Sequence, residues 1–542
     1  MSHWIVLPIV LPAMMAAFIV LVVRHHPLLQ RVFSLGGTVA LAVLAAGLVW
    51  YTRDGTIVLY QLGDWAAPFG IVLVADRLST LFVLLTSVLA IFVQLYAIGS
   101  GWDMRGRHFH ALFQFQLMGI IGAFLTGDAF NLFVFFEVLL IASYGLMIQS
   151  GGAERFRVGV QYVVFNLLGS TLFLFALGMI YAETGTLNMA DLAARVAAAP
   201  VEHTAGIRTA AVMLLMVFAV KAAILPLHFW LPAAYSSAPA PVAALFAIMT
   251  KVGAYSIIRF YTLVFPPDLE ITQGLFDTWL LPAALMTLAL GMIGVLGARR
   301  LDRLVAFAVI GSMGMLMSAV SVFTPEGIAA ALFYAIHSTF ATAALFLLVD
   351  VVRERRAENR LAFEPAPPIA GGALVAGMFF AAAIAVAGLP PLSGFVGKLM
   401  ILDAAFGDPR AVWIWAVVLS SSLVAVIGFA RAGSTIFWKA HADGVAPPED
   451  EAEEQVEAKA PAMPALPLVA IGGLLAILVA VTVLAGPLQR HLAATASQLF
   501  APGPYIAVVL KTPGKAIEKH DTGDEHHGDD THADDTHQGE EH

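Results

Sequence analysis

Four ionisable side chains lie in strongly apolar parts of the sequence. They are one carboxylate and three lysines, Glu137, Lys221, Lys251 and Lys398. A charge inside a membrane-spanning helix is costly unless it is paired or hydrated, so each residue is a candidate functional residue. Glu137 close to a lysine favours the ammonium form, and its movement or protonation favours release of the lysine proton. The sequence thus indicates proton transfer between carboxylate and lysine; the alternative is a static ion pair that stabilises the bundle.

Two histidines titrate nearest to neutral pH and could relay protons between the lysines. His337 has hydroxyl side chains nearby in the segment AALFYAIHSTFATAALF, and His228 lies beside a proline-containing interruption. For each, the alternative is a buried histidine that is simply hydrogen-bonded. Metal ligation is not expected, because the histidines and carboxylates of the apolar segments are single residues on different helices. The predicted proton-transfer series, with His228 as a further relay, is Glu137, Lys221, Lys251, His337 and Lys398.

The elements that carry these residues are expected to be membrane-spanning helices. Of the 542 residues, 59% are hydrophobic and only 12% are charged, unlike a soluble globular domain. Runs of about 20 apolar residues are long enough to span a bilayer. Fourteen such runs lie near 4–23, 32–51, 78–98, 110–126, 129–149, 158–181, 208–228, 241–263, 278–298, 303–322, 327–349, 371–402, 411–430 and 465–486. The predicted fold class is an all-α polytopic membrane protein with about 14 transmembrane helices.

The loops between these runs differ in charge from one side to the other. Sixteen Lys/Arg lie on one side, and five lie on the other side before the last helix. Because the basic side of a membrane protein faces the cytoplasm, both chain termini are predicted to be outside. Arg259, near the outer end of its helix, is expected to snorkel to the interface. The formal charge of -9 resides in the last 27 residues, which hold ten Asp/Glu and one Lys.

Two of the apolar runs are interrupted at matching places. The seventh contains VKAAILPLHFWLP at 220–232, and the twelfth contains AGLPPLSGFVGK at 387–398. Such a pair predicts two inverted five-helix repeats, helices 4–8 and 9–13, with helices 7 and 12 broken beside a hydrated cavity. The alternative is a pair of ordinary proline kinks. The predicted divisions are 1–109, the repeats 110–265 and 278–439, an acidic cytoplasmic loop 440–464, helix 14 at 465–486, and a C-terminal extension 487–542.

Several functional classes find no support in the sequence. The chain has no cysteine, so it cannot hold Cys-ligated iron-sulfur clusters, and no cofactor is expected. It lacks nucleotide-binding motifs and basic patches with interleaved aromatics, which leaves nucleic-acid binding without support. The tail KHDTGDEHHGDDTHADDTHQGEEH is predicted to be disordered, with weak metal or proton buffering as the alternative.

Long stretches of the chain resemble a known family. They are TGDAFNLFVFFEVLLIASYGLM at 126–147, YAETGTLNMADLA at 181–193 and KAAILPLHFWLPAAYSSAPAPVAALFAIMTKVG at 221–253. The family comprises the antiporter-like subunits of respiratory complex I and of the multisubunit Mrp, or Pha, cation/proton antiporters, and the chain is most similar to its D-type branch. The resemblance covers essentially the whole fourteen-span region.

The resemblance also implies roles for particular residues. Glu137 and Lys221 would form an essential pair, Lys251 a central relay and Lys398 the terminal lysine of the second half. His337 falls where relatives often place a histidine or lysine, whereas Met313 stands where many relatives have a polar residue.

The expected partners follow from the same resemblance. They are the other Mrp subunits in a hetero-oligomer of a bacterial inner membrane, with its dimerisation left open. The transported ions would be H⁺ and Na⁺, with K⁺ and Li⁺ as alternatives. The leading hypothesis is therefore a subunit of a cation/proton antiporter. The runner-up is a proton-pumping subunit of a complex I-like NADH:quinone oxidoreductase or membrane-bound hydrogenase, and a third hypothesis is a scaffold.

Overall fold

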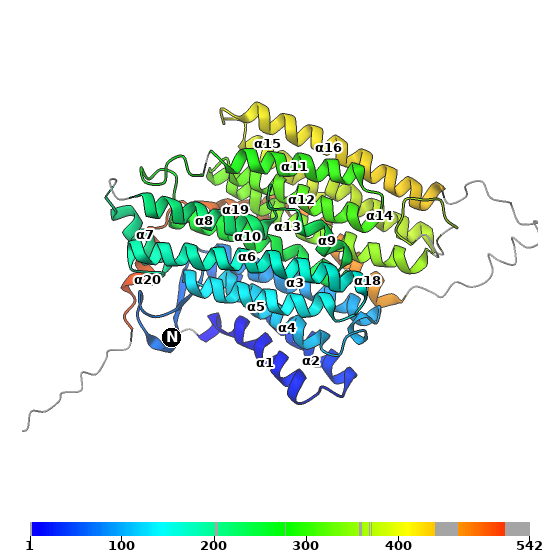
Figure 1. Ribbon diagram of the computed structural model, residues 1–542, viewed down its shortest axis with the longest axis horizontal. Coiled ribbons are helices and arrows are strands. Elements are labelled where there is room, and N and C mark those ends of the chain that lie inside the picture. The colour runs from blue at the N-terminus through cyan, green and yellow to red at the C-terminus, as the bar shows by residue number, and fades with distance from the viewer. Residues whose placement is uncertain are drawn as a thin grey trace, which may run out of the picture.

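The computed structural model describes residues 3–200, 204–276, 278–356, 360–367, 369, 371–439 and 464–514. Most of its helices run side by side along the long axis of the molecule and form one bundle (Figure 1). Within the described residues, eleven helices are long and apolar enough to cross a membrane, or twelve if one bent pair counts as a span. The chain is therefore a mostly helical, multi-pass membrane protein.

The N-terminal part combines three helices with a small hairpin that the all-α prediction did not include. Strands β1 (Val58–Gln61) and β2 (Val72–Ala75) pair antiparallel, after the helices α1 (Leu7–Leu21) and α2 (Pro27–Thr52). Asp76 then begins α3 (Arg77–Gly99) with a capping box, because its side chain accepts from the backbone of Ser79. Short 3₁₀ turns occupy His3–Ile5, Leu62–Asp64 and Trp102–Met104.

The next part contains the first interrupted helix. The chain leaves α8 at Ala222 and becomes helical again at Trp230, so the proline-containing stretch between them is not helical. The elements of this part are α4 (Phe109–Leu125), α5 (Ala129–Ile148), α6 (Ala153–Thr184), α7 (Met189–Ala198), α8 (Ala205–Ala222), α9 (Trp230–Ser237) and α10 (Ala240–Leu263).

The following part contains the second interruption. Helix α14 ends at Ala387 and α15 begins at Ser393. The elements here are α11 (Leu280–Gly297), α12 (Leu301–Val320), α13 (Pro325–Arg355), α14 (Gly372–Ala387), α15 (Ser393–Ala404), α16 (Ala411–Gly433) and the π-helix η5 (Ser434–Trp438).

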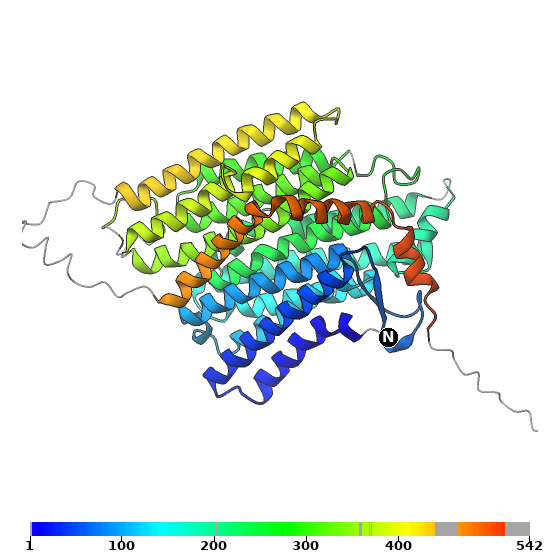
Figure 2. The ribbon, with the colours of Figure 1, turned by 180° about the vertical axis from the view of Figure 1, so that it is seen from behind.

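The last helices cross the face of the bundle that Figure 2 shows. Helix α18 (Ala465–Val483) packs against α3 and α13, and α19 (Ala485–Leu499) continues along α13. A bend of 64° separates α19 from α20 (Gly503–Lys511). Helices α7, α19 and α20 were not predicted, because none of them is an uninterrupted apolar run of about 20 residues.

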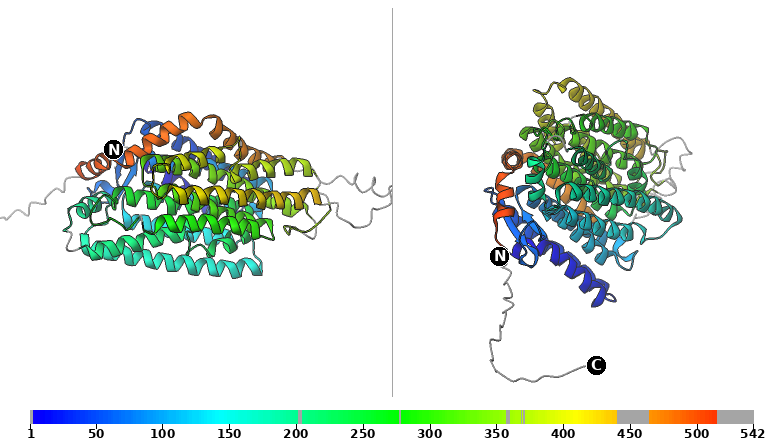
Figure 3. Two further views of the ribbon diagram at one scale, coloured as in Figure 1. Left: turned by 90° about the horizontal axis from the view of Figure 1, so that it is seen from above. Right: turned by 60° about the vertical axis from the view of Figure 1, so that its left-hand side comes forward.

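Two helices form the centre of the bundle. The membrane-span windows of α10 and α13 are entirely buried, and Figure 1 labels both in the middle of the bundle, which Figure 3 shows from two further sides. Gly253 of α10 packs so closely on the end of α8 that a Cβ atom there would lie 2.6 Å from the backbone nitrogen of Ala222. Because α10 carries Lys251 and α13 carries His337, the fold places both residues away from the lipid-facing surface.

The fourteen predicted runs each contain a helix, but three of these helices are shorter than a full span. They are α1, α4 and α14. The predicted acidic loop, apart from its last residue, and the predicted disordered tail lie outside the described residues.

Candidate functional site

Helix α6 lies between the two members of the expected carboxylate/lysine pair. Glu137 on α5 accepts a hydrogen bond from the hydroxyl of Ser170 on α6. Lys221, in the last turn of α8, donates to Oδ1 of Asn166 on α6 at 3.0 Å. The structure shows no direct ion pair between Glu137 and Lys221, both of which it describes. The two residues are thus linked through one turn of α6 rather than by direct contact.

The two bridging residues belong to a buried polar stripe that sequence reasoning missed. Tyr162, Asn166 and Ser170 follow one another at intervals of four residues, so they lie on one face of α6. The Asn166 amide nitrogen donates to the Tyr162 carbonyl at 2.8 Å, and the Tyr162 hydroxyl lies 3.1 Å from the hydroxyl of Ser143. The signal was present in the sequence as polar residues at i, i+4 and i+8 in an otherwise apolar run.

A small cavity adjoins the Lys221 side chain. It has about 10 Å³ of space for a water-sized molecule, and Phe136, Tyr162, Asn166 and Trp230 contribute to its lining. This is about the room that one buried water needs, and the polar groups of Asn166 and Lys221 could bind it. The interior beside Lys221 can therefore hold a proton-carrying molecule without exposure to bulk solvent.

The first interruption holds His228 but does not join it to Lys221. Ala223 adopts a positive φ of 53° directly after α8, and the Leu225 backbone N–H donates to Thr287 Oγ1 of α11 at 2.8 Å. His228 is partly buried, and its Nδ1 atom has no hydrogen-bond partner within the described residues. The structure thus provides no hydrogen-bonded link from His228 to the lysines.

Lys251 is enclosed at the centre of α10. Its exposed fraction is 0%, and its Nζ has no hydrogen-bond partner among the described residues. A buried polar group without a partner is destabilising, and most such groups in native proteins are satisfied by water or serve a function. Lys251 therefore differs from a structural lysine, which would be fixed by an acceptor.

The second interruption is built around Lys398. The Nζ atom donates to the Ala387 carbonyl at 2.6 Å and to the Ser422 hydroxyl at 2.9 Å. Ala387 is the last residue of α14, so no backbone N–H of this helix donates to its carbonyl. The carbonyl also lies at the negative end of the helix dipole. Gly388 has a φ of 72°, and a Cβ atom there would lie 2.5 Å from Lys398 Cδ. The break thus supplies both the acceptor and the space for this lysine.

His337 on α13 contacts the second interruption. Its Nδ1 is 2.9 Å from the hydroxyl of Ser393, the first residue of α15. The imidazole is also within electrostatic range of both Lys251 and Lys398. Of the expected series, Lys251 and Lys398 both act electrostatically on His337, and Glu137 and Lys221 lie at the two sides of α6.

Arg259 corrects one expectation from the sequence. It does not snorkel, because its guanidinium is buried and binds both oxygens of Asp76 at 2.6 and 2.8 Å. Burial alone would raise the pKa of Asp76, but the Arg259 charge and the hydrogen bonds from Ser79 outweigh burial and hold this pKa below its ordinary value. The pair joins α10 to the start of α3, so Arg259 is paired structurally and does not belong to the lysine series.

No group of three or more His, Asp or Glu side chains that could hold a metal ion occurs within the described part of the chain. The six histidines of the tail lie outside that part. The ionisable groups of the predicted series are single side chains on separate helices.

The fold and this series of groups define a multi-pass membrane protein with ionisable side chains through its core. A family model described as "NADH:quinone oxidoreductase/Mrp antiporter, TM" matches residues 126–427, and the chain belongs to this family.

Similar proteins cover nearly the whole chain. The probable K⁺/H⁺ antiporter D-type subunit of Rhizobium meliloti is 37% identical over 95% of this chain and 98% of its own length. The Na⁺/H⁺ antiporter D-type subunit of Bacillus subtilis is 38% identical over 81% of this chain and 87% of its own. A chain in the structure of the Mrp complex from Dietzia sp. DQ12-45-1b has a TM-score of 0.81 and 28% identity, covering 94% of this chain and all of that one.

Proposed function

We propose that the chain is a subunit of a multisubunit monovalent cation/proton antiporter, and that protons pass along Glu137, Lys221, Lys251, His337 and Lys398. The observation that carries the proposal is the burial of Lys221, Lys251, His337 and Lys398 inside a membrane protein, with Lys221 and Lys398 beside the two helix interruptions. His228 would serve as a further relay only if water connects it to Lys221. The role is that of a transporter subunit rather than an enzyme, and it calls for no cofactor.

Helix α6 supplies the switch between Glu137 and Lys221. In the observed arrangement a neutral amide holds the Lys221 amine, and a neutral hydroxyl binds Glu137. A carboxylate stabilises an ammonium more strongly than an amide does. Movement of the Lys221 amine from Asn166 to Glu137 would therefore tighten its hold on a proton, and the return would loosen it. The proton could leave through a water in the cavity beside Lys221.

The finer architecture is part of the same proposal. We take the protein to have fourteen spans, with helices 4–8 and 9–13 as inverted five-helix repeats. Their proposed limits are 110–265 and 278–439, between helices 1–3 (1–109), the acidic loop (440–464), helix 14 (465–486) and the C-terminal extension (487–542). Support comes from the interruptions, because Lys221 lies in the last turn of the helix before the first and Lys398 follows the second. Non-helical backbone at membrane depth is tolerated where it lines a cavity.

The proposed setting is a hetero-oligomer in a bacterial inner membrane, with both chain termini in the periplasm. The Mrp complex of Dietzia supports a multisubunit assembly. The remaining partners would be the other Mrp subunits, and the complex could itself dimerise. We propose Na⁺ as the exchanged cation; the relatives' names include both Na⁺ and K⁺. Near full-length similarity to antiporter subunits favours this function over that of a redox-driven proton pump, although the family includes both.

Ion-driven proton movement in everted vesicles that carry the whole complex tests the proposal. Addition of NaCl or KCl to the wild type should change the internal pH without NADH or quinone. Glu137→Gln and Lys221→Ala should each abolish this change while the complex still assembles. Glu183→Gln, an exposed carboxylate on the same helix α6, is the matched control and should keep the wild-type rate. If Glu137→Gln and Lys221→Ala both transport at the wild-type rate, only a scaffold role remains for the chain.

A further inference from the structure

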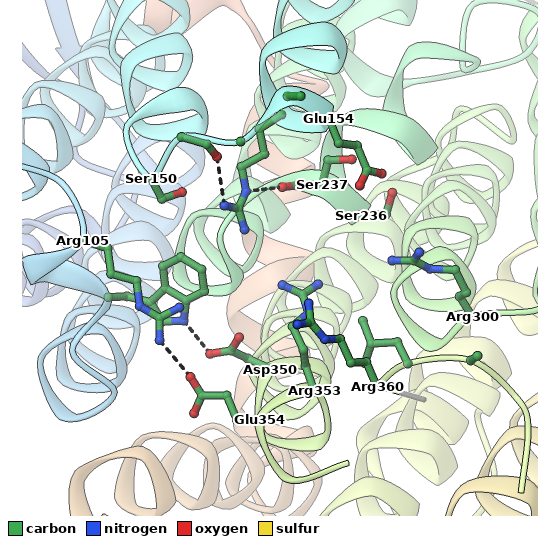
Figure 4. A pocket seen from close by; sticks show the side chains of 17 residues that line it. Arg105, Ser150, Glu154, Ser236, Ser237, Arg300, Asp350, Arg353, Glu354 and Arg360 are labelled. Carbon is green, nitrogen blue, oxygen red and sulfur yellow. Dashed lines mark hydrogen bonds and ion pairs between the residues drawn. The ribbon is translucent and has the colours of Figure 1, made fainter. Parts of the chain in front are cut away.

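A polar cavity of about 630 Å³ lies at one end of the bundle, apart from the lysine series. The α3–α4 loop, the α5–α6 turn, the end of α9, the start of α12 and the end of α13 contribute to its wall. Figure 4 shows arginine side chains gathered around this space, which we call the arginine vestibule. They are Arg105, Arg155, Arg300, Arg353 and Arg360.

The vestibule is not a simple anion site, because several of its arginines already donate hydrogen bonds to oxygen atoms of the protein. Arg105 pairs with Glu354 at 3.0 Å, and Arg300 pairs with Asp302 at 2.7 Å. Arg155 donates to the backbone carbonyl of the last residue of α9 at 2.9 Å. The cavity is therefore highly polar, but much of its positive charge is locally compensated.

Three buried oxygens at the vestibule have no hydrogen-bond partner within the described residues. They are Oδ1 of Asp350 and the hydroxyls of Ser150 and Ser237, and all three residues line the cavity. Buried polar atoms beside a polar space of this size are ordinarily satisfied by water. These three atoms therefore indicate that the vestibule is hydrated.

Asp350 is the buried acid of this lining. The residue is 0% exposed, and its other oxygen, Oδ2, accepts from the Tyr96 hydroxyl at 3.0 Å and from the Trp102 indole N–H at 2.6 Å. These two bonds fix the carboxylate through Oδ2, while Oδ1 has no hydrogen-bond partner among the described residues. Asp350 thus combines a fixed position with one oxygen that is free to gain or lose a proton.

We propose that Asp350 is a proton-exchanging carboxylate, at which protons pass between the water of the arginine vestibule and the interior of the bundle. This inference rests on the proposed function and adds the place where the proton path meets the aqueous phase. A hydronium ion in the vestibule transfers a proton to Oδ1 and becomes water. In the reverse step the carboxylic acid returns that proton to a water molecule.

Helix α13 connects this group to the lysine series. His337 and Asp350 are thirteen residues apart on α13, about 20 Å along the helix axis at about 1.5 Å per residue. The hydroxyls of Thr339 and Thr342 lie between them and donate to carbonyls of their own helix. Their lone pairs stay available as acceptors, and the proposed path toward His337 requires water between these hydroxyls and Asp350.

The absence of cysteine from the chain allows a direct test at this position. Asp350→Cys, in the full complex in everted vesicles, should lower transport by at least about tenfold, because a positioned proton-transfer group contributes roughly 100-fold or more to rate. A thiosulfonate reagent that adds a carboxyethyl group should then restore transport. A reagent that adds a sulfonatoethyl group should not, because a sulfonate brings the charge but does not hold a proton near neutral pH. Glu364→Cys, an exposed acid in the segment that follows the vestibule end of α13, receives both reagents as the control.

Each outcome decides between proton exchange and a structural role. An unaltered rate in Asp350→Cys would overturn the proposal. Restoration by both reagents would show that Asp350 acts only through its negative charge. Restoration by neither reagent after complete labelling would show that Asp350 acts structurally, as the acceptor that holds Tyr96 and Trp102. Lys221→Ala is measured in parallel. If Lys221→Ala transports at the full rate while only the carboxyethyl reagent restores Asp350→Cys, the lysine series is refuted and the proton-exchanging role of Asp350 stands.

Discussion

Replacement of Asn166 by leucine tests whether α6 takes part in the proton step. The leucine fills a similar volume but removes the acceptor that binds Lys221 Nζ at 3.0 Å. A hydrogen bond to a charged group is worth roughly 1.5–3 kcal/mol, and about 1.4 kcal/mol corresponds to a factor of ten. The state in which Lys221 holds its proton beside α6 should become about ten- to a hundredfold rarer. Transport that passes through this state should slow by the same factor.

The assay is the cation-driven pH change in everted vesicles that contain the complete complex, with the amount of assembled complex measured in the same membranes. Ser170→Ala, which removes the hydroxyl bonded to Glu137, should also slow transport. Thr171→Val changes the adjacent residue, which is exposed and bonds only to its own helix, and should leave the rate unchanged. If Asn166→Leu assembles normally and transports within about twofold of the wild type, the bridging role of α6 is refuted.

Three further variants test other parts of the structure. Gly388→Ala should displace Lys398 and lower transport at normal assembly, because the new Cβ would lie 2.5 Å from Cδ at a φ of 72° and add about 1–2 kcal/mol of backbone strain; retention of the wild-type rate would contradict this reasoning. Asp76→Asn should destabilise the folded chain by about 3–5 kcal/mol, because it leaves Arg259 buried and unpaired. The Asp76 pKa is lowered in the folded chain, so the wild type should be more stable than Asp76→Asn at pH values above the ordinary carboxyl pKa. This difference in stability should disappear as the pH falls through the lowered pKa, and thermal unfolding across pH measures it. Lys251→Met should abolish transport but keep or raise the unfolding temperature of the complex, because it removes an amine without a described partner; a large loss of stability would indicate that Lys251 is structural.

Much of the bundle could be predicted because a membrane imposes simple rules on sequence. Uninterrupted apolar runs gave the positions of α2, α3 and α5 to within a few residues. The hairpin of β1 and β2 could not be found in this way, since two four-residue strands in a loop have no comparable signal. The amphipathic helix α19 was missed for a related reason: it packs along other helices and needs only one apolar face.

The candidate site was predictable in its residue types and less so in its contacts. Lys221, Lys251 and Lys398 could be selected because charges are rare in apolar runs. The sequence could not show that Asn166 stands next to Lys221, because this contact depends on how α6 and α8 pack. The expectation for Arg259 was wrong because its partner, Asp76, lies far away in the sequence, just before α3. The position of Arg259 near the end of its own helix does not reveal this partner.

The close contact at Gly253 sets a mechanical constraint on transport. Backbone-to-backbone packing of α10 on the end of α8 leaves no room for the two helices to slide past each other at this point. Lys221 and Lys251 lie within two residues of the contact, so their backbones act as one rigid frame of fixed spacing. Movement between them must come from side-chain rotation and water, over distances of a few ångströms. The Lys221 amine can therefore turn from Asn166 toward Glu137 while the backbones of α8 and α10 keep their spacing.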